Sequence, residues 1–201
     1  MLFRSYNSER CSGNYSGGWR LVRDYSGGMT TDWGAHHLDI VQWALGMDAS
    51  GPQQVTPPPV RDGYGLTYHY ANGVTVTRDA KYEDHDVNGI LFVGTDGRIE
   101  VNRGHFRSWP DEVGNEPLGS SDVHLFRSPG HHANWLDCIR TRERPICDVE
   151  IGCRSVTVCH LGNIAYWTER PIRWDPVKED IIGDEYARRW LDRPKRAPYV
   201  L

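Results

Sequence analysis

Residues 27–46 of the chain read Gly27-Gly28-Met29-Thr30-Thr31-Asp32-Trp33-Gly34-Ala35-His36-His37-Leu38-Asp39-Ile40-Val41-Gln42-Trp43-Ala44-Leu45-Gly46. The two glycines make a flexible approach, and Thr30 or Thr31 is expected to cap the first free N–H groups of a helix. The run to Leu45 predicts about four helical turns, and Gly46 stands where a left-handed residue commonly ends a helix. This stretch therefore predicts one helix between two glycine-marked ends.

The predicted helix would carry polar chemistry on one side and apolar side chains on the other. At helical spacing Asp32 and His36 fall near one face. The apolar side consists of Leu38, Val41 and Leu45. A carboxylate in the first turn is favoured by the free N–H groups there, and it could orient an imidazole one turn further on. Such a pair suits a general base with its partner, although from spacing alone a helix cap beside a solvated histidine is the commoner explanation.

The same stretch resembles the signature helix of the Gfo/Idh/MocA oxidoreductases, the family of glucose–fructose oxidoreductase and inositol dehydrogenase. The family pattern Gly-Gly-…-Asp-x-Gly-x-His-x-x-Asp falls on Asp32, His36 and Asp39 of this sequence. The resemblance implies that Asp32 and His36 are the catalytic pair, with His36 moving a hydroxyl proton and Asp32 orienting it. On the same helix, Trp33, His37 and Asp39 are the candidate substrate-binding residues.

The C-terminal part of the chain resembles the closing helices of this family, over residues 134–165 and 173–176. Family members open with a Rossmann domain that binds the nucleotide and contains a Glu-Lys-Pro segment. Here no Gly-x-Gly-x-x-Gly follows a strand and opens a helix, and no Glu-Lys-Pro occurs. The resemblance, which covers nearly all of the chain, therefore implies the C-terminal substrate-binding and oligomerisation domain alone.

Turn signals divide the rest of the chain. Residues 1–25 are expected to form an irregular lead-in with one short strand around residues 19–22, and residues 26–201 a single domain. The proline-rich residues 47–62 and residues 110–130 are expected to be loops. Alternating apolar residues predict two hairpins and further strands, over residues 66–76, 89–101, 105–109 and 172–174, the last at a sheet edge.

Helical periodicity returns in the C-terminal part, over residues 131–142, 149–168 and 184–192. Together these segments predict the α/β (α+β) class, with a mostly antiparallel sheet of about five or six strands and helices packed on one face. The other face of the sheet would be open, which favours a homo-oligomer formed through it.

Composition excludes several classes of protein. The 201 residues are 38% hydrophobic and 25% charged, as in a globular domain, and the net charge of −4 comes without a basic stripe for nucleic acid. No apolar run reaches membrane-spanning length, and the N-terminus lacks the apolar core of a signal peptide. Five cysteines without Cys-x-x-Cys favour reduced, buried thiols in a cytoplasmic protein.

The acid–imidazole cluster of the signature helix also raises the question of a metal. Adjacent His36 and His37 diverge by about 100° on a helix, so they do not easily face one ion, and we assign no metal ligand. A metal-dependent hydrolase or lyase is thus the weaker enzyme hypothesis.

By resemblance, the expected function is that of the substrate-binding, acid/base-supplying domain of an NAD(P)-dependent oxidoreductase that acts on a sugar or cyclitol. NAD or NADP is expected only for the complete two-domain enzyme, whose Rossmann domain could be a separate chain. The chain alone is expected to bind neither cofactor and to be inactive. A non-catalytic sugar-binding or oligomerisation module, or a gene fragment, stays open as the alternative.

Overall fold

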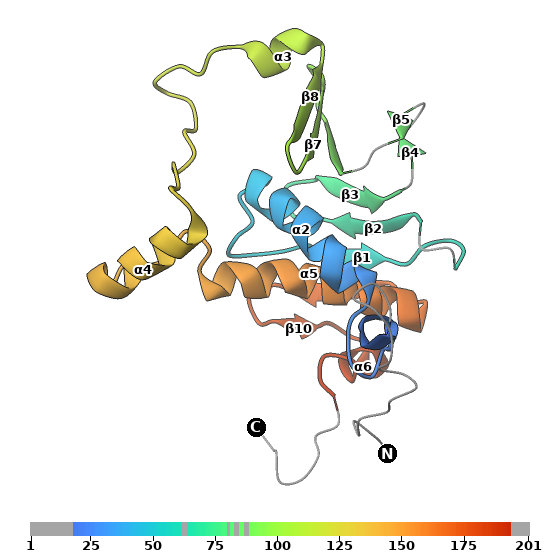
Figure 1. Cartoon of the computed structure of the whole chain (residues 1–201). Coiled ribbons are helices and arrows are strands. Elements are labelled where there is room, and N and C mark those ends of the chain that lie inside the picture. The colour runs from blue at the N-terminus through green and yellow to red at the C-terminus, as the bar shows by residue number, and fades with distance from the viewer. Residues whose placement is uncertain (1–17, 62–63, 80, 83–84, 87–88, 194–201) are drawn as a thin grey trace.

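The computed structural model of the chain describes residues 18–61, 64–79, 81–82, 85–86 and 89–193. Within these residues two long helices, α2 and α5, pack against each other, and α5 lies on a five-stranded antiparallel sheet (Figure 1). A separate three-stranded antiparallel sheet contacts α2 through its first strand. The expected α/β class with antiparallel sheets is confirmed, although the strands form two main sheets instead of one.

Helix α2 (Met29–Ala44) is the predicted signature helix. The predicted threonine cap is wrong, because the N-cap residue is Gly28 and no side chain caps the helix. Gly28 has φ 69°, a left-handed value that glycine adopts readily, so the helix begins before the threonines. Thr31 lies inside the first turn and its Oγ1 donates back to the Gly28 carbonyl at 3.1 Å. The predicted left-handed residue at the other end is confirmed, since Gly46 has φ 65°.

The five-stranded sheet has the order β10-β9-β1-β2-β3, with every neighbouring pair antiparallel. Its members are β1 (Gln54–Thr56), β2 (Leu66–His69), β3 (Thr75–Arg78), β9 (Ile172–Asp175) and β10 (Asp180–Ile181). The predicted first hairpin is present as β2–β3. Its turn is closed by a hydrogen bond of 2.9 Å from the Tyr70 N–H to the Val74 carbonyl.

Two strand assignments from the sequence are wrong. Strand β1 lies inside residues 47–62, where we expected only a loop, yet it occupies the centre of the sheet and Val55 is fully buried. Strand β9 was expected at an edge, but β10 pairs outside it. Strand β1 was missed because it has three residues and its partner β9 comes far later in the chain, and the edge position of β9 was wrong because the two-residue strand β10 is too short to show a period.

The second sheet contains β6 (Ile90–Val93), β7 (Arg98–Asn102) and β8 (His105–Trp109). Strands β6 and β7 form the second predicted hairpin, and β8 is the further strand predicted over residues 105–109. A short pair, β4 (Lys81–Tyr82) and β5 (His85–Asp86), lies between the two sheets in sequence. Helix α3 (Asp111–Asn115) follows β8 and falls in the segment that we expected to be entirely loop.

Near the N-terminus, residues 18–21 form a 3₁₀ turn, η1 (Gly18–Leu21), and not the predicted strand. The Val22 N–H donates to the Trp19 carbonyl, so the backbone curls locally where a strand would need a neighbouring strand. The turn brings Arg20 against α2, where its side chain is largely buried and pairs with Asp32. Most of the predicted lead-in lies outside the described residues, and its boundary at residue 25 stays a prediction.

The C-terminal helices are α4 (His131–Thr141), α5 (Val149–Thr168) and α6 (Glu185–Arg188), the last shorter than predicted. The start of α5 is fixed by Asp148, whose side chain accepts a hydrogen bond of 3.0 Å from the Glu150 N–H. None of the described helices is long and apolar enough to cross a bilayer.

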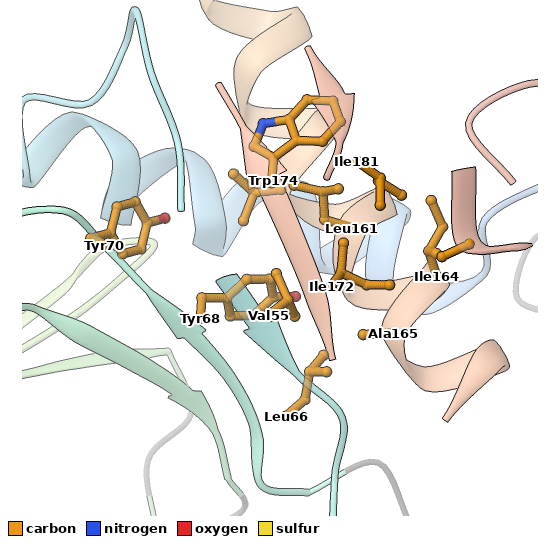
Figure 2. Packing of buried hydrophobic residues seen from close by; sticks show 12 residues of the cluster. Val55, Leu66, Tyr68, Tyr70, Leu161, Ile164, Ala165, Ile172, Trp174 and Ile181 are labelled. Carbon is orange, nitrogen blue, oxygen red and sulfur yellow. The ribbon is translucent and has the colours of Figure 1, made fainter. Parts of the chain in front are cut away.

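The core lies between α5 and the five-stranded sheet. Figure 2 shows Leu161, Ile164 and Ala165 of α5 beside Val55 and Ile172 of the sheet, all at most 2% exposed. The predicted apolar side of α2 is confirmed, because Val41 is buried and both Leu38 and Leu45 pack against this core. The opposite side of α2 is therefore held in a fixed position, facing outward.

Candidate functional site

A cleft of about 790 Å³ opens where α2, the β7–β8 turn and the beginning of α5 meet. Each of the three segments lines it with polar side chains, among them His36, His37, Asp39, Asn102, Arg103, Asp148, Cys153 and Ser155. The volume lies within the range of about 300–1,000 Å³ that is usual for small-molecule sites. Three of the five predicted site residues, His36, His37 and Asp39, thus line one cleft.

His36 is exposed at this cleft and contacts the β7–β8 turn. Its Nε2 lies 2.9 Å from Nη2 of Arg103. Because a guanidinium only donates hydrogen bonds, Nε2 is the acceptor here and carries a lone pair. Trp33, on the preceding turn of α2, presents its ring edge-on to the imidazole with centroids 5.9 Å apart. The arrangement leaves His36 with an acceptor nitrogen in the open part of the site.

His37 is half-buried and lies closer to the protein body than His36. Burial lowers its pKa, a hydrogen bond with Asn102 acts in the opposite direction, and the nearby His36 and Arg103 lower it further. Asn102 also accepts a hydrogen bond of 2.8 Å from the Arg103 N–H through its Oδ1. Asn102 therefore ties the β7–β8 turn to α2 and sets where Arg103 stands.

Asp32 lies in the first turn of α2, as predicted, but its partner is Arg20 and not His36. The two side chains form an ion pair in which Arg20 is about 11% exposed and Asp32 about 33%. Among the described residues, no hydrogen bond joins Asp32 to His36. The turn η1 thus supplies the partner of Asp32, which is not among the residues that line the cleft, and the role of Asp32 on His36 stays a prediction.

Asp39 accepts a hydrogen bond of 2.6 Å from the Ser155 hydroxyl, which joins α2 to α5 at the floor of the cleft. Trp33 is 47% exposed, and the Arg103 guanidinium lies 5.2 Å from its ring centroid. Trp33 therefore lies beside His36, and Asp39 connects the same helix to α5.

The thiols depart from the expectation that they are buried. Cys159 is buried, but Cys147 and Cys153 are exposed and line the cleft. No three His, Cys, Asp or Glu side chains come together as metal ligands within the described part of the chain. Cys11 lies outside the described residues.

A smaller cavity of about 260 Å³ lies at the start of α2, lined by Gly28, Arg23, Arg78 and other residues. A dinucleotide needs free N–H groups at a helix start and room well beyond that of a single drug-sized ligand. This cavity is too small, and Asp32 places a carboxylate in the same first turn. This cavity is therefore not assigned to a dinucleotide, and the expectation that the chain alone binds neither NAD nor NADP stays a prediction.

Sequence reasoning missed Arg20, Asn102, Arg103 and Ser155 as members of the site. Arg103 and His36 are 67 residues apart in the sequence, and Ser155 and Asp39 are 116 apart, so spacing gives no sign of either contact. One local signal existed: Arg103-Gly104 sits between two predicted strands, which places Arg103 at the tip of a hairpin.

The comparisons with known proteins give one match. Residues 1–201 match the Gfo/Idh/MocA family model described as "Oxidoreductase family, C-terminal alpha/beta domain". No curated protein and no solved structure matches the chain. Together with the antiparallel α/β fold and the signature helix α2, this match shows that the chain belongs to the Gfo/Idh/MocA oxidoreductase family and represents its C-terminal α/β domain.

Proposed function

We propose that this domain binds a sugar or cyclitol in the cleft and supplies the acid/base group of an NAD(P)-dependent oxidoreductase. The observation that carries the proposal is the position of His36, which lines the cleft and whose Nε2 accepts a hydrogen bond from the exposed Arg103 side chain. A general base must come within roughly 2.6–3.2 Å of the proton that it removes. A substrate hydroxyl group that replaced the Arg103 guanidinium at His36 Nε2 would meet this requirement.

Oxidation of a secondary alcohol removes a proton from oxygen and a hydride from the adjacent carbon. His36 accepts the proton in the forward direction and returns it in the reverse direction. The proposal assigns NAD(P), which takes up the hydride, to a Rossmann domain, because the sequence has no Gly-x-Gly-x-x-Gly that follows a strand and opens a helix. This chain's own part is to bind the substrate, orient it and move the proton.

Asp32 enters the proposal as a positioning residue. Its pairing with Arg20 fixes the first turn of α2, one turn before His36. Asp32→Asn should therefore lower kcat less than His36→Ala and leave the pH profile of kcat in place. A shifted profile would instead support direct action of Asp32 on the imidazole.

The test combines the chain with a family Rossmann domain, fused or as a separate chain, and measures sugar-dependent reduction of NAD(P). His36→Ala should reduce kcat by about 10²–10⁴-fold, the usual contribution of a positioned acid/base group. His132→Ala, which alters an exposed histidine on α4, is the matched control and should leave kcat unchanged. An active combination that is indifferent to His36→Ala contradicts the proposal.

One observation favours the alternative of a non-catalytic oligomerisation module. Helix α4 has no buried residue, and Trp135, Leu136 and Ile139 are 44–59% exposed on it. Apolar surface of this kind commonly marks an interface. Sedimentation of the chain and of Trp135→Ser would test it: the module predicts a dimer that dissociates in the variant, together with no sugar-dependent reduction of NAD(P) when a Rossmann domain is added, and a monomer in both contradicts it.

A further inference from the structure

Arg103 stands at the tip of the β7–β8 hairpin and points into the cleft beside the proposed base. Its guanidinium lies between His36 Nε2, at 2.9 Å, and the ring of Trp33, at 5.2 Å from the centroid. The Asn102 side chain accepts the Arg103 N–H, and Gly104 follows with φ 66°, so the tight turn sets the direction of the side chain. The arginine is thus held in place at the site.

Arg103 has no carboxylate partner among the described residues. Other arginines of the chain do: Arg20 pairs with Asp32, Arg144 with Asp148, Arg154 with Glu179 and Arg188 with Asp180. Among the described residues, Arg103 lacks a carboxylate partner even though carboxylates line the same cleft.

Both carboxylates that line the cleft are already engaged by other groups. Asp39 accepts the Ser155 hydroxyl at 2.6 Å. Asp148 caps α5 and pairs with Arg144, and these donors lower the pKa of its carboxyl group. Neither carboxylate pairs with Arg103 in the described part of the chain, where its guanidinium instead lies against an imidazole and an indole.

A guanidinium in this situation is a receptor for oxyanions. It presents a planar fork of N–H donors that matches a carboxylate or a phosphate. An incoming oxyanion is a stronger acceptor than the His36 nitrogen and would draw the fork towards itself. His36 Nε2 would then be released for the hydroxyl group of the same ligand.

We infer that Arg103 is a specificity-determining residue and that the cleft takes a sugar or polyol bearing an oxyanion, either a carboxylate or a phosphate. The short distance between Arg103 and His36 places the acidic group and the reacting hydroxyl on one small molecule. Since the cleft is the site proposed above for proton transfer, this role of Arg103 rests on that function.

The test measures binding to the isolated chain by calorimetry, with glucuronate, glucose 6-phosphate and neutral glucose as probes. The acidic ligands should bind at least about 10-fold more tightly than glucose, as expected for a charge-assisted pair. Arg103→Gln should abolish this preference, and Arg103→Lys should retain part of it. Arg107→Gln, on the neighbouring strand, is the matched control and should preserve it. The two acidic probes distinguish a carboxylate from a phosphate.

Three results would overturn the inference: equal binding of glucose and the acids, a preference that survives Arg103→Gln, or no saturable binding of either acid. Histidine side-chain NMR adds a readout that a structural role of Arg103 would not move, since an acid should shift the His36 signals in the wild type but not in Arg103→Gln. Failure of the proposed function remains distinct. It would show as a kcat of the combined enzyme that His36→Ala leaves unchanged. The preference for acidic ligands is measured by binding, without any catalysis.

Discussion

The two halves of helix α5 differ sharply in their surroundings. In the C-terminal half Leu161, Ile164 and Ala165 are at most 2% exposed and pack against the sheet (Figure 2). In the N-terminal half Val149 is 85% exposed, and Gly152 and Cys153 line the cleft. One continuous helix therefore anchors the fold at one end and offers open surface for a ligand at the other. The packed half of α5 therefore holds the exposed half, with its cleft residues, in position.

The largest expected effect is on the packed half. Leu161→Ala should lower the free energy of unfolding by about 2–5 kcal/mol, because it removes a side chain that is 1% exposed and leaves a cavity. Val149→Ala, in the open half, should change it by less than about 0.5 kcal/mol. Urea denaturation of both variants measures the difference, and similar losses would break the comparison.

The two glycines of α5 give a matched pair with opposite signs. A Cβ atom at Gly162 would overlap the Tyr68 hydroxyl and come 3.1 Å from Leu66 Cδ2, so Gly162→Ala should destabilise the fold by about 1–3 kcal/mol. A Cβ at Gly152 meets nothing within 4 Å. Gly152→Ala should therefore stabilise the helix by about 0.5–1 kcal/mol. Thermal unfolding of both variants checks the signs.

The thiols of the two halves should differ in reactivity. Burial raises the pKa of the Cys159 thiol to about 12, with a hydrogen bond opposing it and Asp39 reinforcing it. Cys153 is exposed. At pH 8 a thiol reagent should modify Cys153 in the native chain and leave Cys159 intact until denaturant is added. Peptide mapping by mass spectrometry reads both sites, and early labelling of Cys159 would contradict the packing.

A smaller effect is expected from His37. Because burial lowers its pKa below 6.5, the folded chain binds the proton less readily than the unfolded chain. This contribution to stability is complete above pH 6.5 and declines as the pH falls through the lowered pKa. His37→Gln should flatten the pH dependence of unfolding in that window. An unchanged slope would place the pH sensitivity elsewhere.

The sequence was most informative where structure is local. Helix α5 was predicted to the residue, because Asp148 caps it and Pro171 follows it, and both hairpins were marked by their turns. Strand β1 was missed because its central place depends on pairing with β2 and β9, which no local pattern encodes. The threonine cap was wrong because the backbone of Gly28 decides the helix start.

The candidate site shows the same difference between local patterns, which the sequence reveals, and long-range contacts, which it does not. His36, His37 and Asp39 were found from one helix, since spacing and family resemblance both lie within it. Arg20 and Arg103 come from other segments, and only the fold brings them to Asp32 and His36. The partner of a charged residue is thus the part of a site that a single sequence hides most effectively.

The most direct test of the central claim, that the cleft beside His36 is the ligand site, is an NMR titration of the chain with glucuronate and with glucose. The account predicts saturable shifts of the Trp33 indole and His36 imidazole signals, with the buried Trp174 indole unchanged. Shifts confined to Trp174 or other residues away from the cleft, with Trp33 and His36 unmoved at saturation, would contradict it.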